Sequence, residues 1–271
     1  MKKFKTIKLF CLLFLLAALS GGCSNNKSAS AQPSESSGLK QESEKTSYVM
    51  GLDDTFAPMG FRDEKGNLVG FDIDMANEAA ERMDINIQFQ PIDWSMKETE
   101  LNAGNIDFIW NGYSITEERK EKVAFSAPYL KNSQIIVVLA DSDIKSKDDL
   151  AGKNIAVQAE SSALDAVNSE PEFVDKVNEL TEFSTNNEAF MDLEAGRSDA
   201  LIVDEVLARY YMKQKSQGNY KVLDEDFGDE EYAVGLRKSD TELLEKLDAA
   251  FDEMKNDGTY DRIYAKWFSE N

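Results

Sequence analysis

Leu101-Asn-Ala-Gly-Asn-Ile-Asp-Phe-Ile109 and Leu193-Glu-Ala-Gly-Arg-Ser-Asp-Ala-Leu201 are two stretches with the same order of residue types. Each predicts a helix that ends at its glycine, a short turn that contains an aspartate, and a buried strand. The two glycines, Gly104 and Gly196, are 92 residues apart, which is too long for a solenoid and fits two similar α/β lobes. Chance recurrence of such joints, which occur in any α/β chain, is the alternative that the sequence leaves open.

The chain around the first stretch also alternates between strand and helix patterns. Apolar and polar residues alternate across Ile85–Phe89, which predicts a strand, and apolar residues recur at helical spacing from Ile73 to Met83. Alternation of this kind predicts an α/β fold whose strands are mostly parallel.

The N-terminal residues predict an exported protein. Four lysines between Lys2 and Lys8 precede an unbroken apolar run, Leu9–Leu19, and small residues then lead to Cys23. The run is too short for a permanent transmembrane helix and suits a signal peptide of residues 1–22, whereas the basic flank argues against a buried core helix.

Cys23 predicts a lipid anchor. A leucine, small residues and a cysteine resemble the bacterial lipobox, in which the cysteine is lipidated and becomes the mature N-terminus. The usual leucine position is occupied by Ser20, with Leu19 one residue further away, and a chance cysteine beside an ordinary cleavage site is the alternative. We expect palmitate-type acylation and attachment to the outer face of the cell membrane.

Residues 23–47 predict a flexible linker, because they contain many serines and Leu39 is the only large apolar side chain. The remaining residues, 48–271, are enough for two modest lobes.

Composition disfavours several functions. The chain has no histidine, and its two cysteines lie at Cys11, inside the signal segment, and at Cys23, so a thiol catalyst or thiolate metal site is excluded from the body. We therefore expect no enzyme activity, no cofactor and no metal. A net charge of −21 makes nucleic acid an implausible partner and favours a soluble monomer.

Polar residues follow four predicted strands, where ligands of α/β sheets bind. Strands at Tyr48–Leu52, Ile106–Trp110, Ile155–Gln158 and Ala200–Val203 are followed by Asp53–Pro58, Asn111–Arg119, Glu160–Ser162 and Asp204–Glu205, respectively.

These groups have the chemistry to bind a zwitterion. The Arg119 guanidinium and free N–H groups at Ser114 and Ser162 suit a carboxylate, and Asp204 with the Gly112 carbonyl suits an ammonium.

Phe56 and Trp94 could sandwich an apolar or amide side chain of the ligand between their rings. Each candidate also has an ordinary interpretation. Arg119 could be a solvated helix residue, Ser161 and Ser162 helix caps, Asp204 the start of a helix, and the two aromatics core residues. The functional hypothesis depends on the convergence of all four segments at strand ends.

Several stretches resemble the polar amino-acid solute-binding proteins of ATP-driven importers, family 3. They are Gly70-Phe-Asp-Ile-Asp74, Tyr113-Ser-Ile-Thr-Glu-Glu-Arg119, Phe125-Ser-Ala-Pro-Tyr129, Gly235-Leu-Arg237 and Asp257-Gly-Thr-Tyr-Asp261. The resemblance runs from about residue 47 to the C-terminus.

The resemblance implies a two-lobed fold of the periplasmic-binding-protein type, type II, with two hinge strands and the ligand in the cleft. Lobe I would be 48–131 and 228–271 and lobe II 132–227, with crossings near Lys131 and Phe227. Permease and ATPase subunits of an ABC importer are the implied partners.

By the same resemblance, Arg119, Ser114 and the backbone at Ser161 and Ser162 would bind the α-carboxylate, and Asp204 with Gly112 the α-ammonium. The ligand's side chain would lie against Asp53 and Asn111, between Phe56 and Trp94. Glutamine, cystine and a basic amino acid all remain open.

Glu160 departs from the family pattern, which usually has glycine before the two serines. Its carboxylate would crowd the site or point to solvent, and exposure is the commoner state of glutamate.

Two rival functions use the same scaffold. An enzyme would have to work with carboxylates alone. A sensor module would usually adjoin a transmembrane helix and a signalling domain, neither of which we expect here.

Overall fold

The computed structural model describes residues 45–215 and 218–269. The expected signal peptide 1–22, the lipidation site Cys23 and most of the expected linker 23–47 lie outside these residues. None of the helices in the described part is long and apolar enough to cross a membrane.

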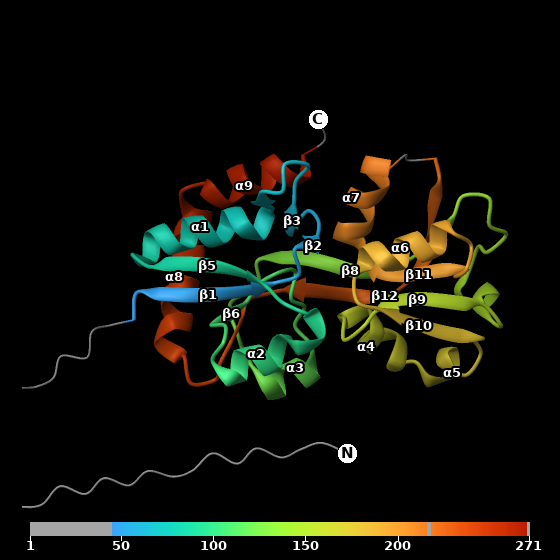
Figure 1. The fold of residues 1–271 in the computed structure, drawn as a ribbon, viewed down its shortest axis with the longest axis horizontal. Coiled ribbons are helices and arrows are strands. Elements are labelled where there is room, and N and C mark those ends of the chain that lie inside the picture. Colours follow the sequence, from blue (N-terminus) through green and yellow to red (C-terminus); the bar gives the residue numbers. More distant parts are fainter. Residues whose placement is uncertain (1–44, 216–217, 270–271) are drawn as a thin grey trace, which may run out of the picture. The chain divides into compact units, whose positions relative to one another are not determined.

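Two five-stranded sheets form the frame of the described chain (Figure 1). The strands of the first sheet, in spatial order, are β5 (Asn86–Pro91), β1 (Ser47–Leu52), β6 (Phe108–Ile109), β13 (Gly235–Leu236) and β7 (Ala124–Phe125). Those of the second are β10 (Glu179–Phe183), β9 (Asn154–Gln158), β11 (Ala200–Asp204), β8 (Leu130–Leu139) and β12 (Tyr220–Tyr232). A small third sheet contains β2 (Thr55–Phe56), β3 (Gly60–Arg62) and β4 (Leu68–Val69).

The two large sheets begin with the same topology. β1 pairs in parallel with β5 and β6, and β9 pairs in parallel with β10 and β11. The repeated sequence stretches precede the equivalent strands β6 and β11. Helix α2 (Lys97–Ala103) ends at Gly104, with φ 80°, and α6 (Asn186–Glu194) is followed by Gly196, with φ 68°. The two-lobe interpretation of the repeat is therefore confirmed.

β6 is shorter than the expected Ile106–Trp110, because only Phe108 and Ile109 pair in register with β1. Trp110 still donates its N–H to the Gly51 carbonyl at 3.3 Å, so the chain continues along the sheet beyond the strand.

Helices cover both faces of the first sheet (Figure 1). One face carries α1 (Phe71–Met83), α8 (Thr241–Asn256) and α9 (Thr259–Phe268), and the other carries the 3₁₀ turn η1 (Trp94–Met96), α2 and α3 (Glu117–Lys122). Buried Met75 and Phe251 join one hydrophobic cluster, and Leu101 and Tyr113 join another on the opposite face.

The second sheet is covered in the same way. Successive side chains of β8 point to opposite faces of this sheet. Ile135 and Val137 therefore face α6 and α7 (Glu205–Lys215), whereas Ile136 and Val138 face α4 (Ser162–Asn168) and α5 (Pro171–Val174). Each such side chain contributes roughly 1.5–3 kcal/mol when fully buried. The 3₁₀ turn η2 (Lys147–Leu150) lies beside β12.

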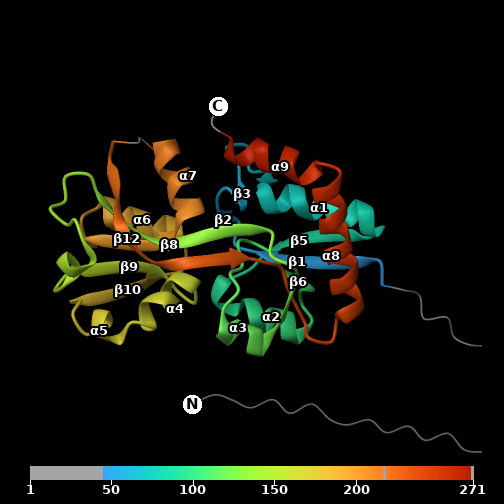
Figure 2. The same cartoon turned by 180° about the vertical axis from the view of Figure 1, so that it is seen from behind.

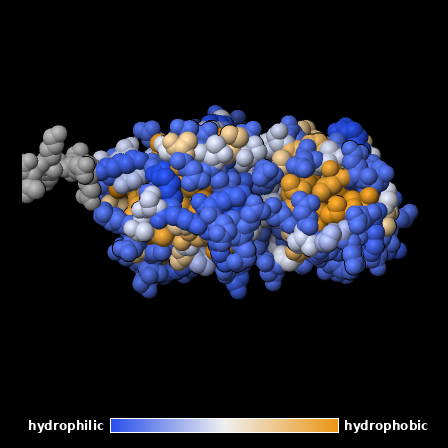
Figure 3. All heavy atoms as spheres, turned by 90° about the horizontal axis from the view of Figure 1, so that it is seen from below, coloured by the Kyte–Doolittle hydropathy of each residue, from blue (hydrophilic) through white to orange (hydrophobic). Residues whose placement is uncertain are grey.

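Hydrophilic residues cover most of the face seen in Figure 3. One hydrophobic area lies on the half that contains the second sheet, on the right.

β8 and β12 link the two sheets (Figure 2). They pair antiparallel from Leu139↔Tyr220 to Leu130↔Tyr232, and beyond that end they continue toward β7 and β13 of the first sheet. The chain thus passes between the sheets twice, and the expected two-lobed α/β fold with two hinge strands is confirmed.

Candidate functional site

All ten candidate ligand-binding residues are buried. Asp53 directly follows β1, Asn111 follows β6, Ser161 lies just beyond β9, and Asp204 ends β11. The polar residues therefore lie at the carboxyl ends of these strands, as the sequence predicted.

Arg119 is buried although it belongs to the charge-dense helix α3. Its side chain is 4% exposed, against 49% for the next residue, Lys120. Nη1 donates to the Ser114 carbonyl at 3.1 Å, Nη2 donates to the Glu160 carbonyl at 3.3 Å, and the guanidinium lies 4.7 Å from the Tyr113 ring centroid. Arg119 is thus not the solvated helix residue of the ordinary interpretation.

The serines connect the two sheets. The Oγ atoms of Ser114 and Ser162 lie 2.9 Å apart. Ser161 caps α4, because its Oγ accepts the N–H of Leu164 at 3.1 Å, and it also donates to the Gln158 carbonyl at 2.7 Å. The expected capping role of Ser161 is confirmed, and it leaves the backbone at the start of α4 facing Ser114.

Asp204 is surrounded by neutral hydrogen-bond donors. Its Oδ1 accepts from Tyr232 Oη at 2.6 Å, Asn132 Nδ2 at 2.7 Å and Gln134 Nε2 at 2.9 Å. Burial, followed by the charge of nearby Glu230, raises the pKa of Asp204 to about 8.

Asp53 and Asn111 lie together at the other part of the site. Asn111 Oδ1 accepts the N–H of Asp53 at 3.1 Å, and Gln158 Nε2 from the second sheet donates to Asp53 Oδ2 at 3.0 Å. Burial raises the pKa of Asp53. Among the described residues, Asn111 Nδ2 has no hydrogen-bond partner although it is buried, so a polar donor is available there.

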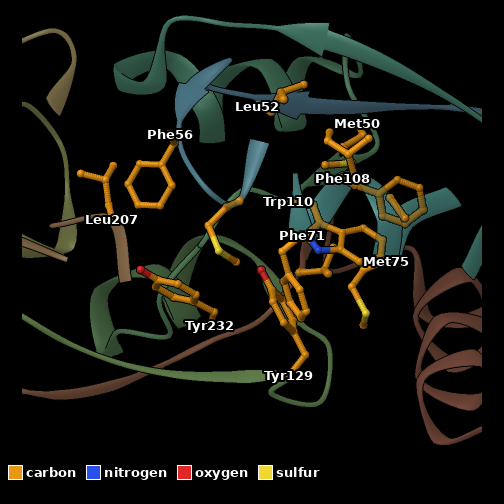
Figure 4. Close-up of a cluster of buried hydrophobic side chains, with 14 of the residues drawn as sticks. Met50, Leu52, Phe56, Phe71, Met75, Phe108, Trp110, Tyr129, Leu207 and Tyr232 are labelled. Atoms are coloured by element: carbon orange, nitrogen blue, oxygen red, sulfur yellow. The ribbon is translucent and has the colours of Figure 1, made fainter. Parts of the chain in front are cut away.

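Phe56 packs beside Leu207 of α7, as Figure 4 shows. A Cβ at Gly112 would lie 2.8 Å from a carbon of the Phe56 ring, and Gly112 has φ 58°, so only glycine fits against this ring. Trp94 contacts Tyr113 edge to face at 6.0 Å in a different hydrophobic cluster. The role of the two rings as opposite walls of one pocket stays a prediction.

Sequence reasoning missed Lys97. This lysine is 1% exposed, and its Nζ donates to the Glu160 carbonyl at 2.8 Å and lies 5.3 Å from the Trp94 ring centroid. Burial, followed by the charge of Arg119, lowers its pKa to about 8. Nothing in the local sequence distinguishes it from a surface lysine at a helix start.

Glu230 and Gln158 were also missed. Glu230 lies in an acidic run on β12, and such a run is typical of a solvated surface. For Gln158 the local pattern predicts only the end of a strand. A surface cavity of about 480 Å³ runs along β8 and β12, and Asn132 and Glu230 are part of its lining. The same two residues contact the Asp204 network.

Most of the chain matches a known protein family. Residues 48–270 match the bacterial extracellular solute-binding proteins, family 3. This chain belongs to that family.

Family 3 relatives cover nearly the full length of the body. The lysine/arginine/ornithine-binding periplasmic protein of Escherichia coli (strain K12) is 33% identical over 82% of this chain and 87% of that protein. The ABC transporter glutamine-binding protein GlnH of Bacillus subtilis (strain 168) is 31% identical over 98% and 96%. The crystal structure of an ABC uptake transporter substrate binding protein from Streptococcus pneumoniae with bound histidine is 43% identical, with a TM-score of 0.81, over 83% of this chain and 93% of that chain.

Two residues of the family 3 stretches explain details of the site. Asp72, within Gly70–Asp74, accepts the N–H of Gly112 at 2.8 Å and the hydroxyl of Tyr129 at 3.0 Å, and so positions the Gly112 backbone. Burial raises the pKa of Asp72 to about 7.

Glu160 has φ 53°, in the left-handed region that favours glycine. Its side chain is exposed, as expected, while its carbonyl accepts hydrogen bonds from Lys97 and Arg119.

Proposed function

We propose that this chain is the extracytoplasmic substrate-binding component of an ABC importer and that it binds a free polar L-amino acid between its two lobes. The observation that carries the proposal is the burial of opposite charges, Arg119 in α3 on one side and Asp204 at the end of β11 on the other. A buried guanidinium and a buried carboxylate are suited to the two charges of a zwitterion.

We assign lobe I to 48–131 and 228–271 and lobe II to 132–227. Contacts that cross this boundary support the assignment, since they join opposite sides of the site. Examples are Ser114 with Ser162, Gln158 with Asp53, and Arg119 with the Glu160 carbonyl. In this proposal, Arg119, Ser114, Ser161 and Ser162 bind the α-carboxylate, and Asp204 and Gly112 bind the α-ammonium.

The ligand's side chain would contact Asp53 and Asn111, between Phe56 and Trp94. An ionised or neutral Asp53 and the free amide hydrogens of Asn111 suit a basic or amide side chain. Relatives are named for lysine, arginine and ornithine, for cystine, and for glutamine, and these are the ligands to test first.

A thermal-shift screen with the common amino acids tests the proposal. A ligand at about 100 times its dissociation constant adds about 2.7 kcal/mol to the free energy of unfolding. We expect a polar amino acid to give the largest shift. A screen in which no amino acid changes the melting temperature would contradict the proposal.

We further propose that the protein binds its ligand without converting it. The relatives are named for binding. Full recovery of unchanged ligand after incubation would support this, and a new product would favour the enzyme alternative. Neighbouring permease and ATPase genes would favour the importer over a sensor.

Anchoring through Cys23 is the remaining part of the proposal, and we expect a monomer held at the outer face of the membrane. Cys23→Ala should release the protein into the medium or leave the signal uncleaved. Normal processing together with membrane retention in this variant would exclude the lipid anchor.

A further inference from the structure

A second carboxylate lies beside Asp204. Glu230 Oε1 accepts from Asn132 Nδ2 at 2.6 Å and from Gln134 Nε2 at 2.8 Å. The same two nitrogens donate to Asp204 Oδ1 at 2.7 and 2.9 Å. Because both amide groups bridge the two acids, Asp204 and Glu230 lie side by side at this end of the site.

Glu230 also faces the proposed ligand position. Its Oε1 accepts from Ser114 Oγ at 2.6 Å, and Ser162 Oγ lies 3.4 Å away. Ser114 and Ser162 come from opposite sheets, whereas Glu230 lies on the hinge strand β12. A single carboxylate oxygen therefore meets groups from both lobes and the hinge.

The neighbouring charged and titratable groups do not neutralise this pair. Within the described residues, no lysine or arginine forms a salt bridge with Asp204 or Glu230. Glu205 is bound by Arg209 at 2.6 Å, and Arg119 donates to the Ser114 carbonyl. The phenol of Tyr232, whose pKa burial raises well above 10, is a neutral donor, and the side chain of Lys131 is exposed.

Asp204 is buried and Glu230 is partly buried, and two carboxylates this close disfavour the doubly ionised state unless a cation or a proton lies with them. We propose that Glu230 binds the ligand's ammonium together with Asp204, and that a proton shared by the two carboxylates competes with the ligand. This inference rests on the proposed function. Because Glu230 belongs to β12, the same contact would join the ligand to a strand that crosses between the lobes.

The direction of the pH effect follows from the raised pKa. Below about 8 Asp204 holds a proton, which the ammonium has to displace. Affinity should therefore rise with pH toward about 8, by at most about tenfold per pH unit, and ligand binding should release a proton. Lys97 stays mostly charged below this pH, since its own pKa is about 8.

Isothermal titration with L-arginine and L-glutamine tests the proposal, since neither amino acid titrates between about pH 6 and about pH 7.5. Two buffers of different ionisation enthalpy give the number of protons released. We expect wild-type affinity to rise several-fold across this range, with proton release. Glu230→Gln keeps an acceptor oxygen but removes the charge that adds to burial in raising the Asp204 pKa, so it should reduce proton release, flatten the pH profile and weaken binding about tenfold near pH 7.5. Glu231→Gln, an exposed neighbour on the same strand, should behave as wild type.

Two outcomes would overturn the proposal: wild-type binding by Glu230→Gln, or a parallel loss of affinity at every pH with proton release retained. The latter would make Glu230 a structural support for Ser114. If neither amino acid binds the wild type, the proposed function is in question, and infrared titration of the free protein decides the present inference. A protonated carboxyl band that disappears in Asp204→Asn and titrates at lower pH in Glu230→Gln supports the shared proton, and its absence in wild type overturns it.

Discussion

The two ends of the candidate site are built alike with opposite charges. At one end, Arg119 and Lys97 are buried near each other and donate to backbone carbonyls. At the other, Asp204 and Glu230 accept from amide and hydroxyl groups. Ser114 connects them, because its carbonyl accepts from Arg119 and its hydroxyl donates to Glu230.

Each end therefore contains a pair of like charges, of which Lys97, Arg119 and Asp204 are buried and Glu230 is partly buried. The lysine pKa is lowered to about 8 and the aspartate pKa is raised to about 8, because burial and a like-charged neighbour both favour the neutral form. At the cationic end, carboxylates also lie near the charges, since Glu98 is 3.4 Å from Lys97 Nζ and Asp165 is 3.9 Å from Arg119 Nη2. At the acidic end, the hydrogen-bond partners are neutral amides and hydroxyls. Such a site gains most from a ligand that carries both charges.

The ends differ in how they join the lobes. Lys97 and Arg119, on the side of the first sheet, both donate to the carbonyl of Glu160 beside the second sheet. Asp204 contacts only residues of β8 and β12. Both residues of the cationic end thus span the site directly, whereas at the acidic end it is Glu230 of the hinge strand that reaches the first-sheet side, through Ser114.

Arg119→Ala should have the largest effect on binding. It would leave the ligand's carboxylate desolvated without its charged partner, which typically costs about 2–5 kcal/mol. We expect at least about a thirtyfold loss of affinity by isothermal titration.

Lys120→Ala is the matched control for Arg119→Ala, since its side chain is half exposed and bonds only to Glu117. Unchanged affinity in a folded Arg119→Ala variant would show that the cationic end does not bind the ligand.

Asp204→Ala should impair closure more than Phe56→Ala does. Phe56 can hold the ligand against the first lobe, whereas Asp204 engages only when the second lobe approaches. Small-angle scattering should show a smaller radius of gyration with ligand than without in wild type, with less compaction in Asp204→Ala. Equal compaction in both proteins at saturating ligand would exclude Asp204 as the closing contact.

Lys97→Met should separate binding from stability. Loss of the second cation should weaken ligand binding by about tenfold, equivalent to about 1.4 kcal/mol.

Lys97→Met should also change how the free energy of unfolding depends on pH. Because the folded-state pKa of Lys97 is lowered from 10.5 to about 8, the unfolded state binds more protons, and wild-type stability gains from this group as pH rises from about 8 to about 10.5. Urea unfolding should show this gain in wild type and its loss in Lys97→Met. An identical pH dependence in both proteins would show that Lys97 keeps an ordinary pKa.

Local pattern predicted the α/β class and the places of the candidate site residues, and the resemblance to family 3 supplied the two lobes and the hinge strands. Apolar periodicity located β1, β9 and β11 to within a residue, and the glycines at 104 and 196 follow their helices as expected. The candidate ligand-binding groups then follow from the rule that ligands of α/β sheets bind at strand ends.

What the sequence did not predict is the burial of charge. Lys97 and Glu230 stand among residues typical of a solvated surface, and only the packing of distant elements buries Lys97 and partly buries Glu230. Arg119 could not be separated from its neighbours in α3 for the same reason. A charged residue acquires a shifted pKa from neighbours far along the chain, and no local pattern records them.

Glu160→Gly should produce the smallest effect and sharpens the description of the cationic end. Glu160 and Asp84 are non-glycine residues with positive φ among those described, at 53° and 52°. The left-handed conformation costs an ordinary residue about 1–2 kcal/mol, and glycine loses about 0.5–1 kcal/mol in chain entropy, so each glycine variant should gain up to about 1 kcal/mol of stability.

Asp84→Gly, at the C-cap of α1, is the matched control and should leave affinity unchanged. Glu160→Gly keeps the carbonyl that Lys97 and Arg119 share but removes a negative charge near them, so it should also strengthen ligand binding about twofold. Equal stabilisation in both variants with a gain in affinity in Glu160→Gly alone would show that the carboxylate acts on the cations and not on the backbone. A destabilised Glu160→Gly would mean instead that the side chain makes contacts that outweigh its conformational cost.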